Sequence, residues 1–334
     1  MKNIFYALLF FAVISLFFIF KEKQKTQSVP EQNMVKNEKQ IYVGAWVGGF
    51  WENQKLNISP LFNFQNTLGK KMAIANFYDG WEYLASPEFI NNLNQISSHG
   101  WVPMVSSNPY FFAGCPGKKE DNLYQKIASG SCDQFLKEIA DNLKSYNKPI
   151  LLRFAWEMNL PQMYWSIPLL NSTNNDFKNA WIHFHNVLKN NGAINVQWVL
   201  SFNTTGQNTI PYKELYPGDG FVDWVALDGY NWGKTPFKNV FEQSYQELTS
   251  ITAKPIMLSE TNSVPNDYKA TWLSQLLTEL PDTFPQIKAI IFFNEDKSNL
   301  GEVDWRIEKS TNYINSVKSG LNNTIYSSEY SLPQ

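Results

Sequence analysis

The stretch Lys148–Asn159, KPILLRFAWEMN, joins a short apolar run to a turn that carries a carboxylate. Pro149–Phe154 has the length and the aliphatic and aromatic content of a buried β-strand, and Glu157 follows close behind it. An amphipathic, helix-like segment near residues 175–190 comes next. A strand, a polar turn and a helix thus form one unit, and the recurrence of this unit decides the fold.

The same unit repeats between residues 41 and 318. The other predicted strands are Ile41–Val47, Lys71–Phe77, Trp101–Val105, Asn195–Ser201, Val222–Leu227, Lys254–Leu258 and Ala289–Phe293. Helix-like segments lie near 57–68, 86–98, 132–146, 237–252, 267–279 and 304–318, while only a short turn around Tyr212–Leu215 follows the fifth strand. Apolar strands that alternate with helices are typical of parallel strands covered on both faces.

Two architectures fit such a pattern, a closed barrel and an open doubly wound sheet. Eight units favour the barrel. No Gly-x-Gly-x-x-Gly follows the first strand and no phosphate-binding glycine-rich loop is present, which disfavours a nucleotide-binding sheet. We therefore predict a single-domain α/β protein with a (β/α)8 TIM barrel at residues 41–320, a C-terminal tail at 321–334 and no cofactor.

The N-terminus carries an apolar run, Ile4–Phe20, broken only by Ser15. Its length suits either a short membrane-spanning helix or a long signal-peptide core. Large residues stand where cleavage needs small ones, so the pattern favours an uncleaved anchor at residues 1–20 over a cleaved signal peptide. Residues 21–40 are charged and rich in Gln, which predicts a flexible linker. We expect an exported protein, membrane-anchored or secreted, that contacts the membrane only through this segment.

The cysteines and the charge add further expectations. Cys115 and Cys132 lie in one predicted loop, and in an exported protein they predict a disulfide, the alternative being two reduced thiols.

A net charge of -2 gives no indication of nucleic-acid binding. The spacing of the histidines predicts no metal site. The 12 Trp residues suit a cleft in which indole rings stack on sugars. We expect a monomer that binds a polysaccharide or oligosaccharide.

Barrel enzymes carry their active sites at the C-terminal ends of the strands. Glu157 follows the fourth predicted strand and Glu260 follows the seventh, so the two face each other across the mouth. Retaining glycosidases need two carboxyl groups about 5–5.5 Å apart, one as nucleophile and one as acid/base. A structural alternative is a simple ion pair with Arg153, but two opposed carboxylates flanked by Trp, Tyr and Asn favour catalysis.

Four separated motifs make residues 41–318 resemble glycoside hydrolase family 26, a family of retaining barrel β-mannanases with related β-glucanases and β-xylanases. They are Lys148–Asn159 with Tyr164-Trp165, Val222–Gly233, Lys254–Glu260, and Phe293-Asn294 with Asp304-Trp305-Arg306. The resemblance implies that Glu157 is the acid/base, that Glu260 is the nucleophile and that Tyr230 hydrogen-bonds the nucleophile. It also places Arg153, Asn203 and Trp305 in the catalytic subsite. We add Trp156, Asn159, Trp165 and Trp232 as candidate substrate-binding residues.

One departure from the family pattern bears on function. Trp156 occupies the position before the acid/base where the family usually has His, and an indole offers one donor and no acceptor. Our leading hypothesis is a β-mannanase-like, retaining endo-β-glycan hydrolase acting on mannan, another β-glycan or a bacterial exopolysaccharide. The alternative, which Trp156 motivates, is a carbohydrate-binding pseudoenzyme on the same barrel.

Overall fold

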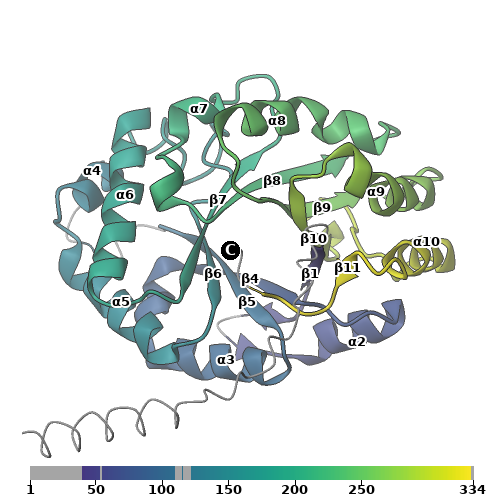
Figure 1. Ribbon diagram of the computed structural model, residues 1–334, viewed down its shortest axis with the longest axis horizontal. Helices are drawn as coiled ribbons and strands as arrows, with labels where there is room; N and C mark the ends of the chain where they lie inside the picture. Colours follow the sequence, from purple (N-terminus) through teal and green to yellow (C-terminus); the bar gives the residue numbers. More distant parts are fainter. Residues whose placement is uncertain (1–39, 53–54, 110–114, 116–121, 332–334) are drawn as a thin grey trace, which may run out of the picture. The chain divides into compact units, whose positions relative to one another are not determined.

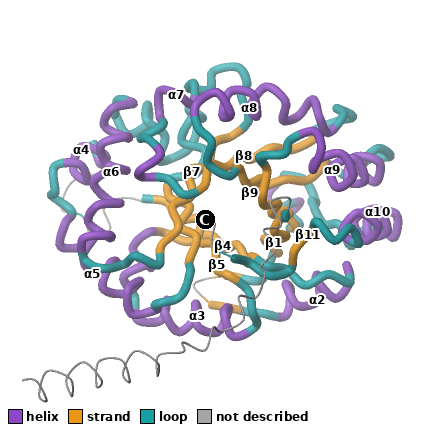
Figure 2. Tube along the Cα trace, viewed as in Figure 1, coloured by secondary structure: helices purple, strands orange, loops and turns teal. Residues whose placement is uncertain are grey.

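The computed structural model describes residues 40–52, 55–109, 115 and 122–331. Within them one parallel sheet has the strand order β10-β9-β8-β7-β6-β5-β4-β1-β11, and β10 also pairs with β1. That last pairing closes the ring, which confirms the predicted (β/α)8 barrel. Figures 1 and 2 show the strands at the centre and the helices around them.

The strands of the ring are β1 (Ile41–Val47), β4 (Ile74–Gly80), β5 (Val102–Asn108), β6 (Ile150–Phe154), β7 (Val196–Asn203), β8 (Trp224–Asn231), β9 (Ile256–Ser263) and β10 (Ile287–Asn294). Two-residue strands β2 (Trp51–Glu52) and β3 (Lys55–Leu56) pair antiparallel beside it. The helices are α2 (Ser59–Leu68), α3 (Pro87–Ser98), α4 (Leu123–Ala128), α5 (Asp133–Tyr146), α6 (Asn174–Asn190), α7 (Tyr212–Leu215), α8 (Phe237–Ile251), α9 (Lys269–Thr283) and α10 (Thr311–Leu321), with short 3-10 turns at Trp81–Ala85, Asp219–Phe221 and Ser298–Leu300.

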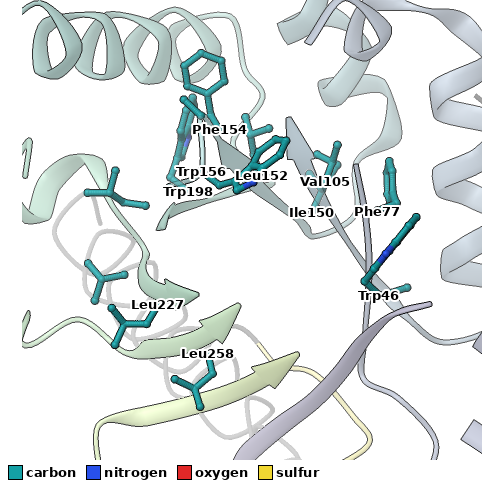
Figure 3. Packing of buried hydrophobic residues seen from close by; sticks show 14 of the residues in the cluster. Trp46, Phe77, Val105, Ile150, Leu152, Phe154, Trp156, Trp198, Leu227 and Leu258 are labelled. Carbon is teal, nitrogen blue, oxygen red and sulfur yellow. The ribbon is translucent and has the colours of Figure 1, made fainter. Parts of the chain in front are cut away.

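Alternation along the strands separates two apolar cores. Leu151 belongs to the small cluster inside the barrel, whereas its neighbours Ile150 and Leu152 belong to the large cluster shared with the helices. The same alternation holds for Met257 inside and Leu258 outside. Figure 3 shows several side chains of the large cluster on their strands. Because both faces of each strand are buried, the strands read as continuous apolar runs.

Several strands extend further than the sequence predicts. The pairing of β8 with β9 continues through Asp228–Glu260 to Asn231–Ser263, and that of β4 with β5 continues to Gly80–Asn108. The prediction ends each strand where its apolar run ends, but polar residues at the barrel mouth continue the backbone pairing. Glu260 therefore lies within β9 and not after it.

Two predicted boundaries near the C-terminus are wrong. The helix predicted at 304–318 begins only at Thr311, and residues 304–310 form a loop. The segment predicted as a tail from 321 instead includes β11 (Tyr326–Ser327), which pairs with the start of β1. The Tyr330 ring packs on Tyr42, with 4.8 Å between ring centroids. Hydrophobic periodicity cannot reveal so short a strand, because two residues show no period.

The structure also bears on the cysteines and the leader. Cys115 and Cys132 form a disulfide with a sequence separation of 17. Among the described residues, no helix is both long and apolar enough to cross a membrane. The predicted anchor at 1–20 and nearly all of the predicted linker lie outside the described residues.

Candidate active site

A cavity of about 760 Å³ lies at the C-terminal ends of the strands and contains both predicted catalytic carboxylates. Aromatic side chains dominate its walls, and charged residues from the loop after β10 line one side. The lining residues are Trp46, Tyr78, Trp156, Glu157, Leu160, Gln162, Met163, Asn203, Thr204, Tyr230, Trp232, Glu260, Phe293, Glu295, Lys297, Glu302 and Trp305.

An unusual backbone carries Glu157 into this cavity. Ala155 and Glu157 both have left-handed conformations, with φ of 48° and 54°, just after β6 ends. Such values are strained for residues other than glycine and persist only where the surroundings impose them. Here the Ala155 N–H donates to Ser107 O at 2.8 Å, and the Glu157 N–H donates to Ser201 O at 2.9 Å. These bonds to the strands on either side hold the turn.

The environment of Glu157 suits an acid. Burial first, and then the negative charge of Glu260, raise the pKa of Glu157 to about 7. A hydrogen bond from Asn203 Nδ2 to Glu157 Oε1, at 2.6 Å, and the positive charges of Arg153 and Lys297 act in the opposite direction. A carboxyl group with a pKa near neutrality can hold a proton and release it during a reaction.

Glu260 has a different environment, because three donors converge on it. Its Oε1 accepts from Tyr78 OH at 2.7 Å and from Arg153 Nη1 at 2.7 Å. Its Oε2 accepts from Tyr230 OH at 2.6 Å. Burial raises the pKa of both tyrosines well above the usual value, so both hydroxyls keep the proton that they donate. An ionised carboxylate is a pure acceptor, and this set of donors holds one in a single orientation.

Arg153 lies beneath the cavity and joins Glu260 to a second buried carboxylate. Its Nη1 donates to Ser106 Oγ at 2.9 Å as well as to Glu260, and its Nη2 is paired with Asp228. Burial alone would lower the pKa of Arg153, but the charges of Asp228 and Glu260 raise it above its ordinary value. Ser259 Oγ donates to Asp228 Oδ1 at 2.7 Å and thereby satisfies the other carboxylate oxygen. Both terminal nitrogens of the buried guanidinium are thus paired, which favours a rigid floor.

Trp156 packs among aromatic rings at the edge of this floor. Its ring centroid lies 4.3 Å from that of Trp165, whose Nε1 donates to Trp156 O at 2.6 Å. The Tyr78 ring meets Trp156 edge to face at 5.4 Å, and the Arg153 guanidinium lies 5.6 Å from the indole centroid. The indole is only 9% exposed but still lines the cavity.

An aromatic wall stands on the side of β8 and of the loop after β10. The centroid of Trp305 lies 4.7 Å from that of Tyr230 and 5.0 Å from that of Trp232. Trp305 is almost fully buried, and its carbonyl accepts from Asn262 Nδ2 and Lys269 Nζ, each at 2.8 Å. Trp232 is 67% exposed, so one face of its indole is open to a ligand. Aromatic faces of this kind suit the apolar faces of sugar rings.

The predicted site residues divide into two groups. The first group lines the cavity and consists of both predicted catalytic residues, Glu157 and Glu260, and the predicted binding residues Trp156, Asn203, Tyr230, Trp232 and Trp305. Arg153, Asn159 and Trp165 do not line it, and that they bind substrate stays a prediction. Arg153 and Asn159 are fully buried, and Trp165 is 6% exposed. Each of the three donates a hydrogen bond to a residue that lines the cavity, namely Glu260, Asn203 and Trp156 respectively.

Sequence reasoning missed Tyr78, Lys297 and Glu302. The second predicted strand, Lys71–Phe77, ends one residue before Tyr78, which the structure places within β4. The rule that nominates Glu157 and Glu260 would have nominated Tyr78 too. Lys297 and Glu302 form an ion pair, with 2.8 Å between Lys297 Nζ and Glu302 Oε2, in the loop after β10. In an irregular loop no sequence pattern indicates which side chains point toward the cavity. Among the described residues, no group of three or more His, Cys, Asp or Glu side chains could hold a metal ion.

A closed (β/α)8 barrel whose mouth places two carboxylates among indole rings is the arrangement that barrel glycoside hydrolases use. The chain is similar to glycosyl hydrolase family 26, whose family model matches residues 116–273. Endoglucanase H of Acetivibrio thermocellus is 29% identical over 296 residues, which are 84% of this chain and 30% of that protein. The chain thus spans less than a third of the length of this curated relative.

Solved structures share the fold. A Bacillus subtilis mannanase superposes with a TM-score of 0.62 at 19% identity, covering 87% of each chain. The catalytic domain of an endo-β-1,4-mannanase from Bacillus sp. JAMB-750 gives a TM-score of 0.64 at 14% identity, over 86% of this chain and 87% of that one. A third structure is a β-mannanase from a symbiotic protist of the termite Reticulitermes speratus, complexed with a gluco-manno-oligosaccharide. It gives a TM-score of 0.59 at 20% identity and covers 88% of this chain and 90% of that one.

Proposed function

We propose that the barrel is a retaining endo-β-glycan hydrolase that works by double displacement with Glu157 and Glu260. The observation that carries the proposal is the contrast between the two carboxyl groups in one cavity. Glu157 has a pKa raised to about 7, whereas Glu260 accepts hydrogen bonds from Tyr78, Tyr230 and Arg153. A proton donor and an oriented anion are the two groups that a retaining glycosidase requires.

In the first step Glu260 attacks the anomeric carbon while Glu157 transfers its proton to the departing glycosidic oxygen. The carbon–oxygen bond to the leaving sugar breaks as the bond to Glu260 forms. In the second step Glu157, now ionised, takes a proton from water, and the resulting hydroxyl displaces Glu260 from the anomeric carbon. The starting charge states of both residues are then restored.

The substrate class follows from the cavity and from the relatives together. Indole faces at Trp156, Trp232 and Trp305 suit pyranose rings, and the cavity places four Glu side chains beside one Lys, which suits a neutral glycan better than a polyuronate. The similar proteins are named as an endoglucanase, a mannanase and an endo-β-1,4-mannanase. We therefore propose a neutral β-linked glucan, mannan or mixed gluco-mannan as substrate, cleaved within the chain.

The test is hydrolysis of linear mannan, glucomannan, mixed-linkage glucan, xylan and bacterial exopolysaccharide by the full chain. We expect reducing ends from at least one β-glucan or mannan, with the β-anomer as the first product seen by NMR. Glu157→Gln and Glu260→Gln should each lower kcat about a thousand-fold or more while the protein stays folded. An α-anomer as first product would contradict retention.

The same panel separates the enzyme from a binding protein. A carbohydrate-binding pseudoenzyme would show affinity for one of these glycans by calorimetry but release no reducing ends. Hydrolysis that survives in either Glu variant would place the chemistry elsewhere.

We also propose that the barrel works outside the cytoplasm. The Cys115–Cys132 disulfide supports this, because such bonds persist in oxidising compartments. Fractionation of expressing cells, with and without residues 1–20, tests the proposal; barrel found in the cytoplasm of cells making the full chain would contradict it.

A further inference from the structure

The two oxygens of Glu260 do not receive equal numbers of donors. Oε1 accepts from two groups, Tyr78 OH and Arg153 Nη1, each at 2.7 Å. In the described part of the chain, Oε2 accepts from one group, Tyr230 OH, at 2.6 Å. A carboxylate offers about two lone-pair directions at each oxygen. Both directions are therefore in use at Oε1, whereas one is free at Oε2.

Attack on an anomeric carbon needs a free lone pair that points into the cavity. We propose that Tyr78 is a positioning residue which, together with Arg153, occupies Oε1 and leaves Oε2 as the oxygen that bonds to the sugar. This inference rests on the proposed double displacement and adds to it a named oxygen and a named residue. It gives Tyr78, on β4, a role that differs from that of Tyr230 on β8.

The chemistry assigns Tyr78 its main effect in the second step. As Glu260 Oε2 bonds to the sugar, the carboxylate charge is lost and Oε1 becomes an ester carbonyl that keeps both donors. When water displaces the sugar, the Oε2–carbon bond breaks and its electron pair returns the negative charge to the carboxylate. Hydrogen bonds at Oε1 stabilise that returning charge. In the first step the negative charge of Glu260 is consumed instead. Loss of the Tyr78 hydrogen bond then destabilises the charged ground state, which speeds this step, but it also removes a contact that orients Glu260, which slows it. The two effects oppose each other.

The surroundings of Tyr78 fix its ring for this task. Its ring meets Trp46 edge to face at 5.0 Å and Trp156 at 5.4 Å. Trp156 stands where the family usually has His, and it presents no acceptor that competes for the Tyr78 hydroxyl. The aromatic contacts leave Glu260 as the acceptor that the hydroxyl reaches.

The experiment follows the glycosyl-enzyme directly, with a deoxyfluoro disaccharide that carries a dinitrophenolate leaving group, in cellobiose and mannobiose forms. Intact mass measures the rate at which the sugar is trapped on the full chain, and recovery of activity after removal of excess probe measures release. We expect Tyr78→Phe to slow release about 10- to 100-fold, the loss expected for a hydrogen bond to a charged group, and to change trapping far less. A crystal structure of the trapped wild-type enzyme should show the sugar on Oε2, with Tyr78 and Arg153 still on Oε1.

Tyr326→Phe is the matched control, because its buried hydroxyl donates to Leu277 O at 2.7 Å far from the cavity. It should trap and release like the wild type. Three outcomes would overturn the inference while leaving double displacement in place. They are release by Tyr78→Phe at the wild-type rate, equal slowing of trapping and release in Tyr78→Phe, and a sugar bonded to the oxygen that faces Tyr78. A wild-type enzyme that neither probe labels, although it cleaves a glycan, would overturn the covalent mechanism and this inference with it.

Discussion

Asn159 holds the backbone of Asn203 from both sides. Its Nδ2 donates to Asn203 O at 3.0 Å, and its Oδ1 accepts from Asn203 N at 2.9 Å. The Asn203 side chain in turn donates to Glu157 at 2.6 Å. The fully buried Asn159, two residues after the candidate acid, thus positions the residue that orients that acid.

The first prediction concerns Asn159→Ala. Two hydrogen bonds to the backbone of Asn203 are lost, so the amide that orients Glu157 is no longer fixed. We expect kcat to fall about 10-fold and the free energy of unfolding to fall by about 1–3 kcal/mol, as for other buried groups left unpaired. Steady-state kinetics and urea unfolding measure the two effects.

Asn195→Ala is the matched control for this change. Its Nδ2 also bridges two backbone groups, Leu143 O at 3.0 Å and Lys148 O at 2.9 Å, but just before β7 begins, at the opposite end of the barrel. Because Asn195 is only partly buried, this change should cost less stability, and it should leave kcat unchanged. If Asn159→Ala keeps the wild-type kcat, the positioning role is wrong.

The second prediction concerns the pH profile. Glu157 must carry a proton to assist the leaving group, so activity should fall as the pH rises through its pKa of about 7. The positive charge of Lys297 is one of the effects that lower this pKa. Lys297→Met removes the charge, so the basic limb of the kcat/KM profile should move to higher pH.

Lys238→Met provides the comparison, because Lys238 pairs with Glu242 on α8 and does not line the cavity. Its basic limb should coincide with that of the wild type. A limb that moves to lower pH in Lys297→Met would assign it to some group other than Glu157.

The sequence predicts the barrel and both carboxylates for physical reasons. Strands buried on both faces give apolar runs, and the polar residue that ends such a run lies at the mouth. The same reasoning cannot distinguish Asn203, which reaches the cavity, from Asn159 and Arg153, which lie below it. That distinction depends on the left-handed turn at Ala155 and Glu157. The turn is imposed by hydrogen bonds to β5 and β7, and neither Ala nor Glu signals it.

Contacts between side chains on strands that are distant in the sequence also cannot be predicted from the sequence pattern. Tyr78 and Glu260 are separated by 182 positions, and their hydrogen bond exists because the ring brings β4 and β9 around one floor. Likewise the burial of Arg153 depends on Asp228, supplied by β8. Sequence patterns report which face of a strand is buried, but not which polar groups meet across the barrel.

The third prediction concerns Trp232, the most exposed tryptophan of the aromatic wall at 67%. If a sugar ring stacks on it, Trp232→Ala should raise KM about 3- to 10-fold with a much smaller change in kcat, because the stacking contributes to binding before and during reaction alike. Trp232→Phe should recover part of the loss. Initial rates on a defined oligosaccharide measure the split, and an unchanged KM in Trp232→Ala would remove this residue from the binding site.

The last prediction links the candidate acid to stability. The folded protein raises the pKa of Glu157 from the ordinary 4.5 to about 7, first by burial. Below both values Glu157 is protonated in the folded and unfolded states, so its titration costs nothing. Between them the folded state holds a proton that the unfolded state releases, and stability falls as the pH rises. Above about 7 the folded protein bears the full cost of a buried charge.

Glu157→Gln does not titrate and keeps an acceptor for Asn203. It should therefore match the wild type in unfolding free energy near pH ~4 and exceed it by up to about 3 kcal/mol near pH ~8. Urea unfolding across this range measures the difference. Glu279→Gln, an exposed change on α9, should show no such trend. A gain for Glu157→Gln that is independent of pH would mean that the substitution acts through packing and that Glu157 does not hold its proton in the folded enzyme.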